Sequence, residues 1–447
     1  MRRNGQVDRC EEGPEKRLRI PRCVALSTWI IVALNAAIGL ASGSGPEPDD
    51  EKSAFPSSVT VPSEPEARPP LPAPVPSTPA MSTSTPANIR AVSVPRPVLD
   101  PAAQLLDGNE ASEAWTLYIE LESGHRITQR FLVTNSGPGK HNAVAVGHLS
   151  EPGRAPYRFE NGRRRSRWTL SDDGLFFDIA ASHLDLHRPK GELRITKDDI
   201  EIRLFFDFAG HDPSARIPEA QLPAGYQIEL LAVGAPTRGS IQAPWMAEAI
   251  ETRGHTWLVH AWTDDEEAAL LARRVEVFGR DDKTSFYGIQ LRGRGDWESA
   301  WILALDHDRR VIESSINVPA RWSEGGARPG SQNYPTPSGF EIAGEAISGS
   351  ITLGPDWLRY DPLEVIPLPF RWLIRRKSKP REVWADAQIG VRLPSSPHTP
   401  FLPAASKTLS VQAEEASRSK RETEDETVER SVTGVASITY LNPVGRR

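Results

Sequence analysis

Histidine and tryptophan alternate with apolar residues in one segment of the chain, residues 254–262. If this segment is a strand, successive side chains project to opposite faces, so His260 and Trp262 share one face and Trp257 lies on the other. A histidine held between aromatic rings can act as an acid or a base. It can equally hold the fold together by donating a hydrogen bond to a buried tyrosine such as Tyr287. Both interpretations stay open from the residues alone.

A second group of ligand-type side chains consists of His183, Asp185 and His187, spaced two residues apart. On a strand this spacing places all three on one face, where they could hold zinc. Most such strands only carry a solvated polar face, and no cysteine or further histidine pair nearby offers a fourth ligand. The sequence therefore predicts no metal and no other cofactor.

Several catalytic constellations are missing from the sequence. It contains no Gly-x-Ser-x-Gly elbow, no phosphate-binding loop and no His-Glu-x-x-His helix, so the hydrolase, NTPase and metalloprotease classes lack the groups that their chemistry needs. Both cysteines, Cys10 and Cys23, lie near the N-terminus, which excludes disulfides, thiolate metal sites and a cysteine nucleophile from the rest of the chain. A formal net charge of -6 provides no general basic field, and nucleic acid is not expected as a partner.

The first 41 residues have the composition of an export segment. Basic residues dominate residues 1–22, and an apolar run follows from Cys23 to Ala41. This run is about 19 residues long, just enough to cross a bilayer, and the small residues at its end suit signal cleavage. We therefore expect either a cleaved signal peptide or a retained membrane anchor. The protein is expected to be exported to the periplasm, the cell surface or the extracellular space, with membrane contact through this segment if it is uncleaved.

Residues 42–110 form a proline-rich stretch. Fourteen of the chain's 40 prolines lie between Ser42 and Asp100, mixed with Ser, Thr, Ala and Glu. Because proline interrupts the hydrogen bonding of both helices and sheets, no core can form there. The stretch is predicted to be a disordered linker, either a spacer that lifts the folded part from a membrane or cell wall or a merely tolerated tail.

The remainder of the chain consists of short runs of Val, Ile, Leu, Phe, Tyr and Trp, separated by Gly, Pro, Asp and Asn. These are strand and turn signals, and the alternation in residues 200–204 places one face inward and the other in water. Helix is expected to be rare, with one short helix possible over residues 263–274. About 330 residues of this texture favour two closed antiparallel sheets, because closure removes exposed strand edges. The predicted division is a first barrel over 111–250 and a second over 251–447, the second with a charged loop at 413–432.

The segment Gly254–Trp262 resembles the glycine, aromatic, histidine and tryptophan signature of the hydroxyneurosporene synthase (carotenoid 1,2-hydratase) and AttH-like family. The resemblance extends over the β-rich part of the chain and implies two tandem lipocalin-like antiparallel β-barrels in an all-β fold. In the hydratase branch, a Tyr-x-Asp follows the histidine, and His260, Trp262 and Tyr287 match this pattern. Ile289 stands in place of the aspartate, and isoleucine cannot supply the proton that hydration of an alkene needs.

These observations predict an exported or membrane-tethered lipocalin-like protein that binds a hydrophobic small molecule, a lipid or an isoprenoid, in a β-barrel cavity. One alternative is a carotenoid hydratase-like lyase that acts on an apolar polyene. The other is a non-catalytic structural or adhesive module of the cell envelope. The candidate catalytic residues are His260 and Tyr287, and the candidate ligand-binding residues are Trp257, His260, Trp262 and Tyr287.

Overall fold

The computed structural model describes most of the chain after residue 100. The described residues are 101–135, 139–209, 211, 213, 215–306, 311–316, 323–324, 334, 336–344, 347–362, 364, 372, 379–394 and 427–441. The predicted leader (1–41) and the predicted linker up to residue 100 lie outside them. Among the residues that the structure describes, none belongs to a helix long and apolar enough to cross a membrane.

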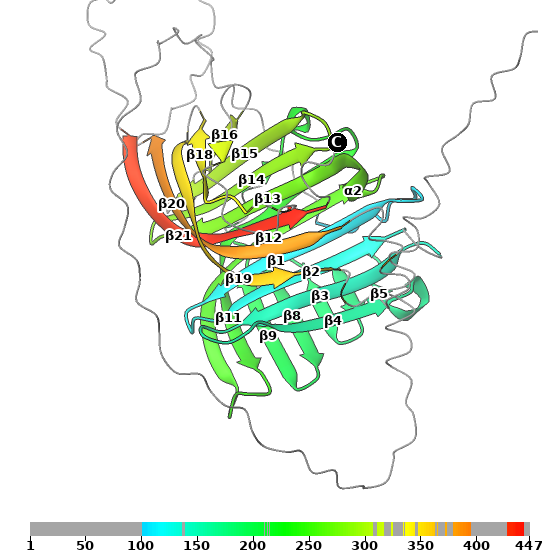
Figure 1. Ribbon diagram of the computed structural model, residues 1–447. Coiled ribbons are helices and arrows are strands. Elements are labelled where there is room, and N and C mark those ends of the chain that lie inside the picture. The colour runs from blue at the N-terminus through cyan, green and yellow to red at the C-terminus, as the bar shows by residue number, and fades with distance from the viewer. Residues whose placement is uncertain are drawn as a thin grey trace, which may run out of the picture.

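Two curled antiparallel sheets account for nearly all of the described chain (Figure 1). The first sheet has the order β4-β3-β2-β1-β12-β11-β9-β8-β7-β6-β5, with β10 beside β11, and the second has the order β16-β15-β14-β13-β21-β20-β19-β18-β17. This confirms the predicted all-β class and the tandem lipocalin-like arrangement. The two barrels that were expected to be closed are half-barrels, because each sheet runs from one edge strand to another. The strands of the first sheet are β1 Ser112–Leu121, β2 Arg126–Thr134, β3 Asn142–Ser150, β4 Tyr157–Arg163, β5 Thr169–Leu170, β6 Phe176–Ile179, β7 Ser182–Asp185, β8 Lys190–Lys197, β9 Ile200–Asp207, β10 Ala215–Arg216, β11 Tyr226–Gln242 and β12 Ile250–Thr263. The strands of the second sheet are β13 Leu271–Arg280, β14 Thr284–Gly293, β15 Glu298–Asp306, β16 Val311–Ile316, β17 Ser323–Glu324, β18 Gly339–Ala343, β19 Ser348–Tyr360, β20 Arg381–Pro394 and β21 Thr427–Tyr440. The helical turns are η1 Arg165–Arg167, η2 Glu219–Gln221 and α2 Glu267–Leu270.

The alternation of apolar and charged residues determines which face of a strand is buried. In β9, Ile200, Ile202 and Leu204 are buried, whereas Glu201 and Arg203 between them are exposed. A strand with this pattern can bury only one face, so its neighbours must share the same inner side. The resulting core lines the concave side of the first sheet.

The two sheets divide the chain later than the sequence suggested. Residues 251–263, which we had assigned to the second barrel, belong to β12 and pair with β1 and β11 of the first sheet. The connection before β12 links two neighbouring strands and is therefore a hairpin, not a linker between domains. The second sheet begins only at Leu271.

Other predicted boundaries also move. Residues 101–110 of the predicted linker pack on the first sheet, where Ala103 donates a backbone hydrogen bond to Gly174 (3.1 Å). The last part of the predicted charged loop, from Thr427, belongs to β21. The possible helix over 263–274 is reduced to the single turn α2, because the chain is already extended in β13 from Leu271.

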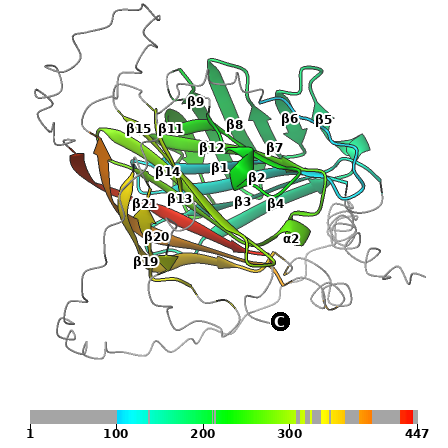
Figure 2. The same ribbon diagram turned by 90° about the horizontal axis from the view of Figure 1, so that it is seen from above.

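Three apolar cores hold these sheets. One lies inside the first sheet and contains large side chains such as Trp115, Phe131 and Phe177, and another lies inside the second sheet. The third core contains residues of both sheets, including Trp257 and Trp384. The half-barrels therefore pack back to back, and in Figure 2 the strands β13, β14 and β21 lie against β1 and β12.

Aromatic rings form the centre of this junction. Tyr118 of the first sheet lies between Trp257 (5.5 Å), Phe278 (5.3 Å) and Trp384 (5.8 Å), measured between ring centroids. The indole N–H of Trp257 donates to the backbone oxygen of Phe286 (3.1 Å), which joins β12 directly to β14. Rings that meet at these separations contribute stability beyond the area that they bury.

Removing the Trp384 ring tests this packing. We expect Trp384→Ala to lower the free energy of unfolding by about 3–5 kcal/mol, because a buried tryptophan at the junction leaves a cavity when truncated. Chemical denaturation followed by circular dichroism measures the change. Phe205→Ala, on an outward face of the first sheet, is the matched control, and a loss for Trp384→Ala no larger than that of the control would contradict the back-to-back packing.

Candidate functional site

The outward face of the second sheet carries a patch of polar residues where it packs against the first. Arg274 and Glu276 lie on β13, Ser437 and Thr439 on β21, and Glu382 on β20. The strand register pairs Arg274 with Thr439, Thr439 with Glu382, and Glu276 with Ser437. The side chains of Arg274, Glu276, Ser437 and Thr439 are buried. They lie beside the aromatic side chains of the core between the two sheets. Buried polar groups in such a cluster are a common mark of a functional site.

Arg274 is the centre of an ion-pair network. Its guanidinium lies 2.8 Å from Glu267 Oε1 and 3.2 Å from Glu276 Oε2, and it donates to the Tyr226 hydroxyl (3.1 Å). Burial alone would lower the pKa of Arg274, but Glu267 and Glu276 outweigh this effect and raise the pKa well above its usual value. Burial likewise would raise the pKa of Glu267, whereas the nearby guanidinium groups bring it below its usual value. Arg274 and Glu267 therefore stay ionised across the physiological pH range.

Tyr287 joins this network through Glu276. The Tyr287 hydroxyl donates to Glu276 Oε1 at 3.0 Å, and burial, followed by the charge of Glu276, raises the pKa of Tyr287 well above its usual value. In the strand register, Glu276 stands directly opposite Ile289. A carboxylate from the neighbouring strand thus lies beside the position where the resemblance led us to expect an aspartate.

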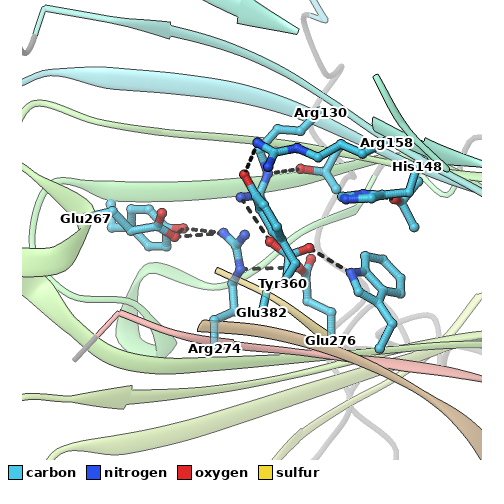
Figure 3. Close-up of polar contacts among 12 residues, drawn as sticks. Arg130, His148, Arg158, Glu267, Arg274, Glu276, Tyr360 and Glu382 are labelled. Carbon is cyan, nitrogen blue, oxygen red and sulfur yellow. Dashed lines mark hydrogen bonds and ion pairs between the residues drawn. The ribbon is translucent and has the colours of Figure 1, made fainter. Parts of the chain in front are cut away.

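The first sheet contributes the opposite wall of this junction site (Figure 3). Arg158 hydrogen bonds to the Tyr360 hydroxyl, and its guanidinium carbon lies 4.1 Å from the centroid of that ring. Arg130 approaches Glu382 to 4.0 Å. His148 lies edge-on to Tyr360, with ring centroids 5.3 Å apart, and burial lowers its pKa to about 4. Both sheets therefore supply polar side chains to one site.

The junction site has hydrogen-bonding capacity that the protein itself does not use. The hydroxyls of Ser437 and Thr439 and the indole N–H of Trp357 are buried, and none of them has a hydrogen-bond partner among the residues that the structure describes. Each unpaired buried group costs about 1–3 kcal/mol relative to a paired one. The side chains of Arg130 and Glu382 at the same site are 22% and 13% exposed, so solvent reaches its edge. Each of these three groups is able to donate a hydrogen bond to an oxygen atom.

His260 lies elsewhere, inside the first sheet. It is fully buried, its Nε2 lies 2.8 Å from Glu113 Oε1, and its ring stacks on Trp115 at 4.6 Å between centroids. Trp262 lies 4.6 Å from the His260 ring on the same face of β12, as the alternation predicted. Glu113 in turn accepts the backbone N–H of Gln104 (2.8 Å). This environment supports a structural role for His260.

The four candidate ligand-binding residues do not form one site. Trp257 and Tyr287 belong to the core between the sheets, whereas His260 and Trp262 face the interior of the first sheet. The hydrogen bond from His260 to a tyrosine such as Tyr287, one of the two interpretations that the sequence left open, is not formed, because these side chains pair with Glu113 and Glu276 respectively.

The sequence reading missed the charged residues that make up the junction site. Charged residues occur in these strands between apolar residues that are buried in the cores, namely Arg274, Glu276 and Glu382. A charged residue in a strand that is otherwise apolar is the sequence signal by which this site could have been predicted.

The histidines of the zinc hypothesis are engaged with carboxylates instead. His187 Nδ1 lies 2.5 Å from Asp185 Oδ1 and its Nε2 lies 2.8 Å from Asp173 Oδ2, while His183 Nδ1 lies 3.3 Å from Asp178 Oδ1. The hydrogen bonds that the His187 ring donates to Asp185 and Asp173 raise the pKa of His187. Within the described ranges, no group of three or more His, Cys, Asp or Glu residues is arranged to hold a metal ion.

Comparison with solved structures defines the fold class. The chain is similar to a protein assigned as AttH from Nitrosomonas europaea, with a TM-score of 0.50 and 13% identity over 78% of this chain and 97% of that chain. Kievitone hydratase from Nectria haematococca matches with a TM-score of 0.47 and 9% identity over 77% of this chain and 94% of its own. CghA in complex with Sch210972 matches with a TM-score of 0.48 and 11% identity over 76% of this chain and 90% of its own. No family model and no curated protein matches the sequence. The AttH match confirms the fold that the resemblance implied, a tandem lipocalin-like fold of the AttH type.

The lowered pKa of His148 makes stability depend on pH. The unfolded chain binds a proton at His148 below about pH 6.5, whereas the folded protein does so only below about pH 4. Stability is therefore lost as the pH falls through this window, by about 3 kcal/mol for this group. We expect His148→Gln to remove this part of the loss, which urea denaturation at pH 7.0 and 4.5 measures. An equal loss in the variant and the unmodified protein would contradict the assignment. His187→Gln is the comparison: because the pKa of His187 is raised, its removal should not reduce the loss of stability on acidification.

Proposed function

We propose that the protein binds a hydrophobic small molecule, a lipid or an isoprenoid, at the junction of its two sheets. The single observation that carries this proposal is the pair of unpartnered buried hydroxyls, Ser437 and Thr439, next to an ionised network and an aromatic cluster. Ligand sites in proteins combine an apolar lining with a few placed polar groups in this way.

The position at the junction follows from the packing. The interior of the first sheet is occupied by Trp115, Phe131 and Phe177, which are fully buried in its core. We therefore place the ligand between the sheets rather than inside a barrel, with Trp257 and Tyr287 among the surrounding residues. The ligand class, a lipid or an isoprenoid, is the one predicted from the sequence. The proposed position, between the sheets, differs from the predicted barrel cavity.

The charged side chains at the junction are already paired with one another, which indicates that the ligand is uncharged. Arg274 is already paired with Glu267 and Glu276, and Arg130 lies near Glu382. A further full charge would disrupt these pairs, whereas a neutral hydroxyl or carbonyl oxygen can bond Ser437 or Thr439 without doing so. The best-suited ligand is an apolar molecule that carries one or two neutral oxygen atoms.

Binding of retinol, an isoprenoid alcohol, tests the proposal. We expect retinol to quench the tryptophan fluorescence of the purified chain in a saturable manner. The double variant Ser437→Ala, Thr439→Val should weaken the affinity by about tenfold, since it removes one or two hydrogen bonds of about 0.5–1.5 kcal/mol each. His187→Gln is the control and should bind as the unmodified protein does. If retinol and other apolar probes do not bind above background, the proposal is wrong and the structural or adhesive alternative gains support.

A second candidate function is a hydratase-like lyase, and one observation favours it. The Tyr287 hydroxyl is bonded to Glu276, so a phenol and a carboxyl group form a proton-transfer pair on the junction face of the second sheet. In such a reaction the pair would pass a proton to one carbon of the double bond and take one back from the water that adds to the other carbon. The raised pKa of Tyr287 makes its hydroxyl a weak acid, so the carboxyl group of Glu276, when protonated, is the better proton donor. His260 would act only by supporting the fold, because it lies on the inner face of the first sheet.

Incubation with an acyclic carotenoid decides the lyase alternative. If the reaction exists, the unmodified protein forms a hydroxylated product and Glu276→Gln reduces its rate at least about a hundredfold, which is typical for loss of a general acid or base. Mass spectrometry of the extracted carotenoid measures the product. Absence of product with the unmodified protein would exclude this alternative for that substrate class.

We also propose that the N-terminal apolar run directs the protein out of the cytoplasm, as a cleaved signal or a membrane anchor. The support is its length and its basic flank. Cell fractionation with N-terminal sequencing of the mature chain distinguishes the two outcomes, and a cytoplasmic, full-length protein would contradict both.

A further inference from the structure

A surface groove lies on the first sheet near the beginning of β12, apart from the junction site. It has a volume of about 800 Å3 and is lined by Glu122, Ser123, Phe205, Arg238, Gly239, Glu251, Thr252 and Arg253. This volume is within the range of small-molecule sites. None of these residues belongs to the candidate site described above.

Two arginines face each other in this groove. Arg238 on β11 stands directly opposite Arg253 on β12 in the strand register, and both side chains are exposed. Residues opposite each other in an antiparallel pair have Cβ atoms about 5 Å apart, and like charges at such positions are destabilising. Neither guanidinium forms an ion pair or a side-chain hydrogen bond with any residue that the structure describes. By contrast, Arg203 on the adjacent β9 is paired with Glu192 at 2.9 Å.

The other residues of the groove restrict the chemistry of its ligand. Phe205 stands opposite Arg238 in the register and supplies a half-buried aromatic ring, with the guanidinium carbon of Arg203 5.1 Å from the ring centroid. Glu122 and Glu251 also line the groove, and neither contacts the two arginines in an ion pair. Two positive and two negative side chains leave the groove neutral overall. A ligand with one negative charge is therefore favoured over a doubly charged phosphate.

We propose that this groove binds the carboxylate of a small apolar acid between Arg238 and Arg253, with the apolar part of the acid against Phe205. Two guanidinium groups can each donate hydrogen bonds to the two carboxylate oxygens, and the bound negative charge removes the repulsion between them. The site is independent of the ligand proposed for the junction.

Titration calorimetry at low ionic strength with benzoate, hexanoate and inorganic phosphate tests this assignment. We expect both carboxylates to bind more tightly than phosphate. Arg238→Gln and Arg253→Gln should each weaken benzoate binding by about tenfold or more, since each removes a charge-assisted interaction. Arg392→Gln, which removes an exposed arginine of the second sheet that is paired with Glu429 (2.9 Å), should change the affinity by less than about twofold. The variant Ser437→Ala, Thr439→Val should bind benzoate normally, which separates this site from the junction site.

Thermal unfolding without ligand supplies a second measurement that does not depend on affinity. Because Arg238→Gln removes a like-charge pair, it should raise the melting temperature by about 1–3 °C, whereas Arg392→Gln, at a position opposite Ser348 and Glu429, should not raise it. No benzoate binding at millimolar concentration, binding that survives Arg238→Gln, or phosphate binding as tight as that of benzoate would each overturn the proposal.

Discussion

A guanidinium group that is buried on folding needs carboxylate partners to compensate for its lost hydration. Arg274 is such a group at the junction of the two sheets. Its partners come from different elements: Glu267 from the turn α2, Glu276 from the same strand, and Tyr226 from β11 of the first sheet. Removing one partner of such a buried set leaves an uncompensated charge, which costs several kcal/mol. The turn α2 and the end of β11 are therefore held against β13, and the relative position of the two half-barrels depends on this contact.

The back-to-back arrangement explains why functional groups gather between the sheets. Each half-barrel fills most of its own concave side with apolar side chains, and the first also buries a polar cluster of His260, Glu113 and Glu229 there. The convex faces meet over a mixed surface in which Tyr118 and Trp384 pack beside the ionised groups. Aromatic rings lower the local dielectric and strengthen the neighbouring ion pairs, while Ser437 and Thr439 keep unused hydrogen-bonding capacity. The strengthened ion pairs suit proton transfer at this junction, and the unused hydrogen-bonding groups suit ligand binding.

Local sequence patterns predicted the strands well, because alternation alone decides which side of Ile200–Asp207 is buried. They also placed His260 and Trp262 on one face of a strand correctly. Local patterns could not show that β12 pairs with β1, because the paired residues, such as Trp115 and His260, are far apart in the sequence. For the same reason the domain boundary was placed too early. The junction site escaped prediction because Arg274 and Glu276 resemble the solvated face of an ordinary strand until a second sheet covers them.

Photoaffinity labelling tests the central claim, a ligand site between the sheets, most directly. A diazirine derivative of an isoprenoid alcohol, activated on the purified chain, should label peptides from β20 and β21, and excess retinol should prevent this labelling. Labels confined to strands that line the interior of the first sheet, such as β6 and β8, would contradict a site at the junction.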